Sequence, residues 1–335
     1  MIREAAAKAA KGKNLSEAEA YAVFGEMMSG RASAHEIKTL LVALRDKGET
    51  VAEITGAAKA MRKKCVRIDA PASAVDTCGT GGSGINTFNI STAAAFVAAG
   101  CGVRIAKHGN RSASSSIGSA DVLEALGVNL SAGPRSVERC VKEIGIGFMF
   151  APLFHGAMKH AAAPRKEIGT RTIFNILGPL SNPARAKRQI LGVYDASLAM
   201  TMAKVLKNLG ACRAMVVHGM DGLDEITTTD RTAVTELKSG RIRTYHVAPE
   251  DFGVRRCKLE ELKGGNAGEN ASALLGVLRG EPGPKRDIVL VNAAAAIVVA
   301  SKAGDFKKGM ELAAVSIDSG RALEKLNKLI EFSKK

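Results

Sequence analysis

The sequence predicts an α/β protein in which a small helical unit at the N-terminus precedes a larger domain built on a β-sheet. Helix-start signatures crowd the residues before Ala70, whereas from Val75 onward short β-like runs alternate with alanine-rich helical stretches. A length of 335 residues with 46% hydrophobic content is enough for a large core and about two domains.

The helical unit is predicted from three capping boxes, in which a hydroxyl and a glutamate three residues later satisfy backbone N–H groups at a helix start. These pairs are Ser16 with Glu19, Ser33 with Glu36, and Thr50 with Glu53. Behind the second pair, Ile37, Leu40, Leu41 and Leu44 have the spacing of one buried helical face. Residues 1–14 predict an amphipathic helix and lack the apolar centre of a secretory signal, so we expect a cytoplasmic protein.

The sheet domain is predicted from apolar β-like runs at 103–106, 190–193 and 214–217, with a helical stretch at 91–99. Residues 232–247, with Ser239 and Gly240 at their middle, predict a hairpin. Residues 163–184 hold closely spaced Pro and Gly without strand alternation. This last segment indicates a crossing between two domains.

The composition narrows the class of function. Lys and Arg number 48 against 33 Asp and Glu, and the net charge of +15 can attract nucleic acid, anionic membrane or small anions. Aromatic residues are 4% and tryptophan is absent, which disfavours stacking surfaces for single strands. The longest apolar run, 289–300, is shorter than the roughly 20 residues of a membrane span. The six cysteines are scattered without a CxxC pair, so we interpret them as small buried hydrophobes.

The strongest chemical signal is a glycine-rich segment at 76–84, followed at once by polar residues and an alanine-rich helix. Its glycines let backbone N–H groups close around a phosphate, and the helix start adds partial positive charge. Side-chain donors follow at Thr87, Asn89, Ser91 and Thr92. The pattern fits neither the dinucleotide fingerprint nor the nucleotide P-loop. It predicts a polyphosphate site, the alternative being a tight strand-to-helix turn.

A second anion-binding loop is predicted at 107–115, directly after the β-like run at 103–106. Lys107 and Arg111 offer cationic donors, and serine hydroxyls follow them. Ligands of α/β sheets usually lie at such strand ends, although an ordinary solvated turn is the alternative.

Acidic and basic residues farther along the chain predict two more parts of a site. Asp221, Asp224 and Glu225 follow the run at 214–217, and Mg²⁺ prefers carboxylate oxygen and often bridges protein to substrate phosphates. The alternative for these acids is a solvated loop. The segment 148–155 ends in His155 and precedes Arg165, whose guanidinium can face a carboxylate in bidentate fashion.

Four segments together resemble the successive signatures of the anthranilate phosphoribosyltransferase family. They are GTGG with NIST at 79–82 and 89–92, KHGNR with SS at 107–111 and 114–115, GSADVLEALG at 118–127, and RTIFNILGPLSNPA at 171–184. The resemblance runs from about Leu15 to Ala322. It implies an enzyme of tryptophan biosynthesis that transfers the phosphoribosyl group of phosphoribosyl pyrophosphate to the anthranilate amine, with Mg²⁺ as cofactor and pyrophosphate as the second product.

The resemblance also implies an architecture. A helical domain at 1–72, completed by about 165–185, would stand beside an α/β domain at 73–164 and 186–335. The α/β domain would have a central mixed sheet flanked by helices, with the active site in the cleft between the domains. The family is commonly dimeric through its helical domain, so we expect a homodimer, and we expect neither membrane nor nucleic acid as a partner.

Roles for individual residues follow from the same resemblance. Those expected to hold Mg²⁺ are Ser91, Asp224 and Glu225, and those expected at the anthranilate site are Gly79, Asn110, Arg165, His108 and His155. Those expected to contact phosphoribosyl pyrophosphate are Gly79, Gly82, Ser83, Thr87, Asn89, Ile90, Ser91, Thr92, Lys107, His108, Gly109, Asn110, Arg111, Ser112, Ala113, Ser114, Ser115 and Ser119. A packing role stays open for each histidine. No residue is assigned as a general base, because an aromatic amine is already neutral at pH 7.

One position departs from the family pattern. The family usually has an aspartate after GTGG, whereas this chain has Ser83, so one anionic group is missing near the expected pyrophosphate. We expect weaker binding of any additional Mg²⁺, with the reaction itself intact.

Two other functions compete with this interpretation. A nucleoside phosphorylase of the same fold would use phosphate and a nucleobase, but the segments at 107–111 and 171–180 resemble the anthranilate branch. A relative that has lost catalysis could bind nucleic acid through its basic surface, but a pure binder needs neither Arg165 nor the pair Asp224 and Glu225.

Overall fold

The N-terminal helical unit forms as predicted. The computed structural model describes residues 1–82, 84–111 and 117–335. Its first helices are α1 (Ile2–Ala10), α2 (Glu17–Met28), α3 (Ala34–Lys47) and α4 (Val51–Lys64). All three predicted capping boxes are present at the starts of α2, α3 and α4. The predicted inner face of α3 is confirmed, since Ile37, Leu40, Leu41 and Leu44 are all buried.

The larger part of the chain is built on one seven-stranded sheet of order β3-β2-β1-β4-β5-β6-β7. The strands are β1 (Val75–Gly79), β2 (Ile105–Gly109), β3 (Ile146–Phe150), β4 (Arg188–Gly192), β5 (Arg213–Gly219), β6 (Thr232–Lys238) and β7 (Arg241–Val247). Neighbours from β3 to β5 pair in parallel, whereas β5–β6 and β6–β7 are antiparallel. The mixed sheet and the hairpin at 232–247 are therefore confirmed. Ser239 and Gly240 turn the hairpin with φ of 49° and 76°, as its tight geometry requires.

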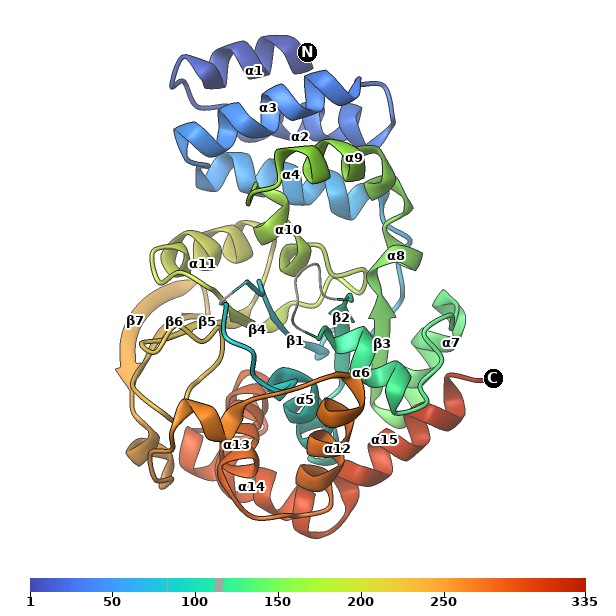
Figure 1. Cartoon of the computed structure of the whole chain (residues 1–335), viewed down its shortest axis with the longest axis vertical. Helices are drawn as coiled ribbons and strands as arrows, with labels where there is room; N and C mark the ends of the chain where they lie inside the picture. Colours follow the sequence, from blue (N-terminus) through green and yellow to red (C-terminus); the bar gives the residue numbers. More distant parts are fainter. Residues whose placement is uncertain (83, 112–116) are drawn as a thin grey trace.

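Helices cover both faces of the sheet (Figure 1). On one face, α5 (Ile90–Gly100), α13 (Pro284–Val299), α14 (Phe306–Asp318) and α15 (Arg321–Phe332) share an apolar core with the strands. On the other face, α10 (Phe174–Leu180) and α11 (Leu198–Asn208) lie between the sheet and the helical unit and share a second core with α1 to α4. The remaining helices are α6 (Ser119–Ala125), α7 (Pro134–Arg139), α8 (Ala151–Phe154), α9 (Lys159–Ile168) and α12 (Ala267–Leu278), with a π-helical turn at Cys140–Ile144 and 3-10 turns at Gly156–Met158, Pro249–Phe252 and Leu259–Leu262.

The segment predicted to cross between domains consists largely of α9 and α10. Helix α9 packs against α2 and α3, and α10 packs against α4. The crossing thus returns the chain to the helical unit before β4 re-enters the sheet (Figure 1).

Some local expectations were wrong. The strand expected at 103–106 begins only at Ile105 and extends to Gly109, because Lys107 and His108 pair with β3 inside the sheet. Lys107 therefore belongs to a buried strand and not to a loop. Cys140 is buried, but Cys212 is exposed and the other cysteines are half-buried, so the interpretation of all six as buried hydrophobes does not hold. Within the described residues, no helix is long and apolar enough to cross a bilayer.

Candidate active site

The candidate site lies where the order of the strands reverses. From β1 the chain continues to β2 and β3 on one side and later returns as β4 on the other side of β1. Ligands of open α/β sheets bind outside the carboxyl ends of the strands at such a point. The central strands β1, β2, β4 and β5 end in Gly79, Gly109, Gly192 and Gly219, which allow neighbouring groups to approach the backbone closely.

The glycine-rich loop after β1 contacts the acidic loop after β5. The Gly81 N–H donates to Asp224 Oδ2 at 2.9 Å. A Cβ on Gly79 would lie 2.3 Å from that same oxygen, and a Cβ on Gly192 would lie 1.6 Å from the Asp224 carbonyl oxygen. Gly79 and Gly192 therefore leave the space that Asp224 fills. Sequence reasoning missed Gly192, because the residues beside it carry no functional pattern.

Lys107 lies beneath the start of α5. Its side chain is buried, and its Nζ donates to the Thr77 carbonyl oxygen and, at 3.3 Å, to Ser91 Oγ. Burial lowers the pKa of Lys107, whereas the negative charges of Asp76 and Glu225 oppose that shift. The ammonium group thus interacts electrostatically with Asp76, near the start of β1, and with Glu225, after β5. Lys107 was predicted as a donor of an anion-binding loop, whereas it lies in strand β2.

Ser91, Asp224 and Glu225 come together at this edge, as the residues predicted to hold a metal should. The Ser91 N–H hydrogen-bonds to Glu225, and Ser91 Oγ contacts Lys107. Burial raises the pKa of both Asp224 and Glu225, and the charge of Asp224 raises that of Glu225 further. Two buried carboxyls this close are costly to ionise without a cation.

This donor set fits Mg²⁺ in particular. Mg²⁺ takes one or two carboxylates from a protein and completes its coordination with water and substrate phosphates. The described residues contain no group of three or more His, Cys, Asp or Glu side chains that could hold a metal ion by themselves. A metal at Asp224 and Glu225 therefore needs further oxygens from a ligand such as a pyrophosphate.

His108 and His155 form a buried pair. Their ring centroids are 4.9 Å apart, and the Nε2 of each ring is buried without a hydrogen-bond partner among the described residues. Burial lowers the pKa of His108 to about 3, with a further contribution from His155, and it lowers the pKa of His155 to about 4. Both rings are therefore neutral at pH 7. Each has one ring nitrogen left for a ligand.

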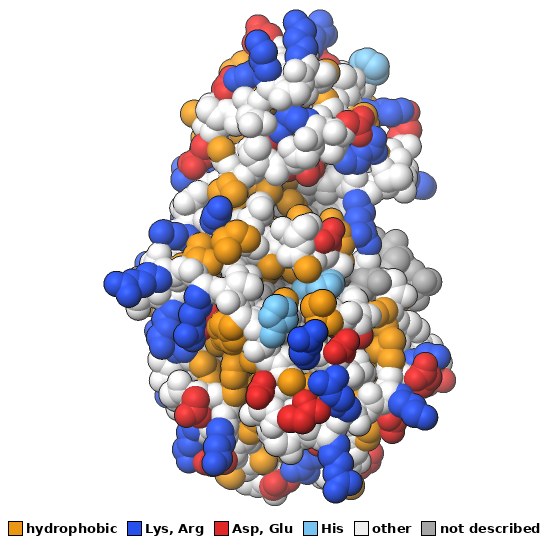
Figure 2. Space-filling model, turned by 90° about the vertical axis from the view of Figure 1, so that its left-hand side faces the viewer, with side chains coloured by type: hydrophobic (Ala, Val, Ile, Leu, Met, Phe, Trp, Pro, Cys, Tyr) orange, Lys and Arg blue, Asp and Glu red, His pale blue; other side chains and the backbone are white. Residues whose placement is uncertain are grey.

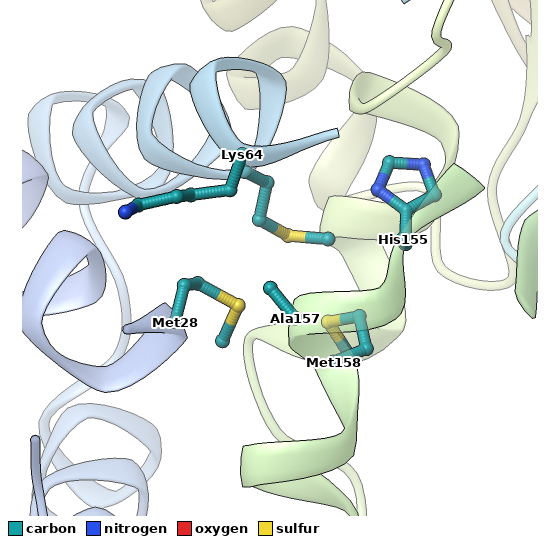
Figure 3. A pocket seen from close by; sticks show the side chains of 6 residues that line it. Met28, Lys64, His155, Ala157 and Met158 are labelled. Atoms are coloured by element: carbon teal, nitrogen blue, oxygen red, sulfur yellow. The ribbon is translucent and has the colours of Figure 1, made fainter. Parts of the chain in front are cut away.

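The helical unit closes one side of this pair. His155 lines a narrow gap, too small to hold a water molecule, between the ends of α2 and α4 and the 3-10 turn before α9 (Figure 3). The gap is lined by Met28, Met61, Lys64, His155, Ala157 and Met158. Methionine side chains adapt to irregular gaps, so this junction can repack without leaving a large void.

The buried histidines predict a loss of stability in acid. The pKa of His108 in the folded chain lies below its unfolded value of about 6.5, so the unfolded chain takes up the proton first as the pH falls. The contribution of neutral His108 to stability is therefore complete above pH 6.5 and is lost as the pH falls toward 3. Between pH 7 and pH 5 this costs about 2 kcal/mol. The wild type should therefore lose about 2 kcal/mol more free energy of unfolding than His108→Gln between pH 7 and pH 5, measured by urea denaturation. The exposed His35→Gln control should follow the wild type, and a parallel curve for His108→Gln would refute the assignment.

Arg165 and Asn110 approach from different elements. The Arg165 guanidinium lies 5.1 Å from the centroid of the Phe174 ring, burial lowers its pKa, and no carboxylate in the described part of the chain pairs with it. Asn110 is exposed just after β2, where its Oδ1 accepts a hydrogen bond from the Arg111 N–H at 2.8 Å. No contact among the described residues joins Asn110 to Arg165. Arg165 nevertheless offers an anionic ligand a cation that no described carboxylate neutralises.

Arg111 makes ion pairs that the sequence did not indicate. Its guanidinium pairs with Asp121 and Glu124, each at 2.8 Å, because α6 presents both carboxylates beside it. The side chain is thus engaged with α6. Of the other expected phosphate contacts, Asn89 Oδ1 and Thr92 Oγ1 are buried without a partner among the described residues. Ser83, Ser112, Ala113, Ser114 and Ser115 lie outside the described residues.

The excess positive charge does not gather into one stripe on the face shown in Figure 2. There, Lys and Arg side chains are scattered from the helical unit to the far end of the sheet domain, with Asp and Glu among them. A basic stripe is the feature expected of a nucleic-acid binder. This face offers none.

Known proteins similar to this chain match it along nearly its whole length. The a/b domain model of a glycosyl transferase family matches residues 71–323, and its helical bundle domain model matches residues 3–65. An anthranilate phosphoribosyltransferase of Acetivibrio thermocellus is 54% identical over 99% of this chain and 97% of its own length. That of Alkaliphilus metalliredigens is 55% identical over 99% of this chain and 98% of its own. The chain belongs to the anthranilate phosphoribosyltransferase family.

Solved structures of anthranilate phosphoribosyltransferases have the same fold. The enzyme from Thermus thermophilus superposes with a TM-score of 0.94 at 44% identity, covering 99% of both chains. The Saccharomyces cerevisiae enzyme, solved in complex with phosphoribosyl pyrophosphate and Mg, has a TM-score of 0.92 at 30% identity and covers 99% of this chain and 98% of its own. The predicted family, fold and transferase class are thus confirmed.

Proposed function

We propose that the chain transfers the 5-phosphoribosyl group of phosphoribosyl pyrophosphate to the amine of anthranilate, a step of tryptophan biosynthesis. The observation that carries this proposal is the convergence of Ser91, Lys107, Asp224 and Glu225 beside the glycine-rich loop at the strand switch point. An unpaired Arg165 and two neutral histidines complete a set suited to an aromatic carboxylate.

The reaction asks mainly for positioning and charge stabilisation. Displacement at the ribose C1 has a transition state with oxocarbenium character, and the departing pyrophosphate gains negative charge as its bond to C1 breaks. Backbone N–H groups of the glycine-rich loop and the start of α5 would bind that charge. Mg²⁺, when bound, would neutralise part of the pyrophosphate charge.

Residues of this chain would hold the metal and the anthranilate ring. Asp224, Glu225 and Ser91 would hold the metal, and Lys107 would keep the buried carboxyls ionised through its own charge. The anthranilate amine needs no strong base, because its lone pair is free at pH 7. His108 and His155, neutral at that pH, would line the anthranilate ring. The proton that the amine loses once the C–N bond has formed would pass to water or to the departing pyrophosphate.

Arg165 would orient anthranilate through its carboxylate. The Phe174 ring steadies the guanidinium, and burial increases the strength of any charged contact it makes. Replacing Arg165 by Ala should raise the anthranilate KM by more than tenfold, the scale of a lost charged hydrogen bond of about 1.5–3 kcal/mol. The KM for phosphoribosyl pyrophosphate should change much less. Steady-state kinetics with an unchanged anthranilate KM would remove Arg165 from the site.

We further propose a location, an assembly and a domain division for the chain. The chain would act in the cytoplasm as a homodimer joined through its helical unit, with residues 1–72 and about 165–185 forming one domain and the remainder the other. Ser83 would weaken binding of an additional Mg²⁺. Gly79, Gly82, Thr87, Ile90, Gly109 and Ser119 would complete the phosphate site.

A further inference from the structure

Arg171 joins the crossing segment to the glycine-rich loop. It lies between α9 and α10, and its Nη2 donates to the Gly82 carbonyl oxygen. Its guanidinium also lies over the Tyr194 ring, 3.8 Å from the ring centroid. Arg171 is exposed, and these two contacts together restrict where its guanidinium and donors can lie.

Tyr194 is itself bound to the same loop. The Tyr194 N–H donates to Thr80 Oγ1 at 3.1 Å, and the Thr80 N–H donates to the Gly192 carbonyl oxygen at 2.9 Å. Thr80 and Gly82 are therefore linked through Tyr194 and Arg171 into a closed ring of contacts. The glycine-rich loop contributes little rigidity of its own, since Gly81 and Gly82 adopt φ of 65° and 80°.

The backbone beside Arg171 is fixed to the helical unit. The neighbouring Thr170 accepts a hydrogen bond through its Oγ1 from Arg45 Nη1 of α3 at 2.7 Å. The Thr172 N–H donates to Asn175 Oδ1 at 3.0 Å at the start of α10. Arg171 thus extends from a segment anchored to the helical unit to the glycine-rich loop after β1.

The charge of Arg171 stays available to the loop. Its guanidinium forms no salt bridge with a carboxylate in the described part of the chain, although its field lowers the pKa of nearby Asp195 as a minor contribution after hydrogen bonds from Ser197. A Cβ on Gly82 would lie 3.1 Å from Arg171 Nη2, so the guanidinium rests directly against the loop backbone. A positive charge there favours an anion bound by the loop.

We propose that Arg171, supported by Tyr194, is a positioning residue that holds the glycine-rich loop in its pyrophosphate-binding shape. This rests on the proposed function, because that function assigns the loop to the pyrophosphate group. Arg171 acts through the Gly82 carbonyl and the loop N–H groups. Its removal therefore weakens binding of the phosphate-bearing substrate and leaves the anthranilate site intact.

The test compares Arg171→Met and Arg171→Lys with the wild type. Arg171→Met removes the charge and the donors, and it should raise the KM for phosphoribosyl pyrophosphate and the Kd of Mg-pyrophosphate, measured by calorimetry, about tenfold each. The anthranilate KM should stay within twofold. Arg171→Lys keeps the charge without the planar fork and should recover only part of the loss. Arg135→Met, an identical charge change on the exposed side of α7, should match the wild type.

A double-mutant cycle with Tyr194 tests whether Arg171 acts by positioning the glycine-rich loop or by a general loss of substrate binding. Tyr194→Leu should raise the KM for phosphoribosyl pyrophosphate, and adding it to Arg171→Met should change that KM by less than twofold more, because both act through one contact. Values for Arg171→Met within twofold of the wild type, or an anthranilate KM that rises in parallel, would overturn the inference. Failure of the wild-type chain to bind Mg-pyrophosphate or form product would instead overturn the proposed function beneath it.

Discussion

Replacing Glu225 by Gln should lower kcat/KM by about 100-fold, equivalent to about 2.7 kcal/mol of transition-state stabilisation. Glu225 is one of two carboxyls that converge beside Ser91, and an uncharged amide is a poor ligand for Mg²⁺. The Mg²⁺ concentration for half-maximal rate should rise as well. Initial rates measured across a magnesium titration give both quantities.

The melting temperature shows whether the lower activity of Glu225→Gln comes from loss of a metal ligand or from unfolding. Burial and Asp224 raise the pKa of Glu225, so its ionised form opposes folding, and the Gln variant should melt at or above the wild-type temperature. Asp230→Asn provides a matched control, since Asp230 lies in the same loop but pairs with Arg256 at 3.4 Å. A Glu225→Gln enzyme within threefold of the wild-type rate, with the same magnesium profile, would exclude Glu225 as a metal ligand.

Replacing Gly79 by Ala should reduce activity by a similar factor through a different cause. The new Cβ would lie 2.3 Å from Asp224 Oδ2 and 3.2 Å from its Cγ, so the carboxylate has to move away. That movement breaks its hydrogen bond from the Gly81 N–H and separates it from Glu225. Gly79 lies at the end of β1 without a positive φ, so the backbone itself accepts alanine. Magnesium dependence and kcat/KM should deteriorate together.

Gly25→Ala is the control for adding a methyl group. Gly25 lies inside α2 with nothing within 4 Å of a Cβ, and alanine is favoured over glycine there by up to about 1 kcal/mol. Its activity should equal that of the wild type, with a slightly raised Tm. If Gly79→Ala were as active as Gly25→Ala, the packing of Gly79 against Asp224 would have no functional importance.

Local patterns made the helical unit and the hairpin predictable. A capping box is complete within four residues, so Ser16, Ser33 and Thr50 identify three helix starts without knowledge of the tertiary fold. The acids at Asp224 and Glu225 were likewise visible because they are contiguous and follow an apolar strand. Features whose chemistry is contained in one short segment can be read directly.

Features that depend on distant partners could not be predicted in the same way. Lys107 was expected in a loop, because its contacts with Thr77 and Ser91 arise only when β1, β2 and α5 are assembled. The ion pairs of Arg111 with Asp121 and Glu124 likewise form only when α6 is folded beside it. Gly192 carries no local signal, and its importance appears only through the Asp224 backbone packed against it. In each case the deciding partner is far away in the sequence.

The phosphoribosyl transfer is tested most directly by mixing the chain with anthranilate, phosphoribosyl pyrophosphate and Mg²⁺ while following anthranilate fluorescence and pyrophosphate release together. We expect a fluorescence loss that needs all three components and the protein, with one pyrophosphate released for each anthranilate consumed. Unchanged fluorescence, or a loss without matching pyrophosphate, would contradict it.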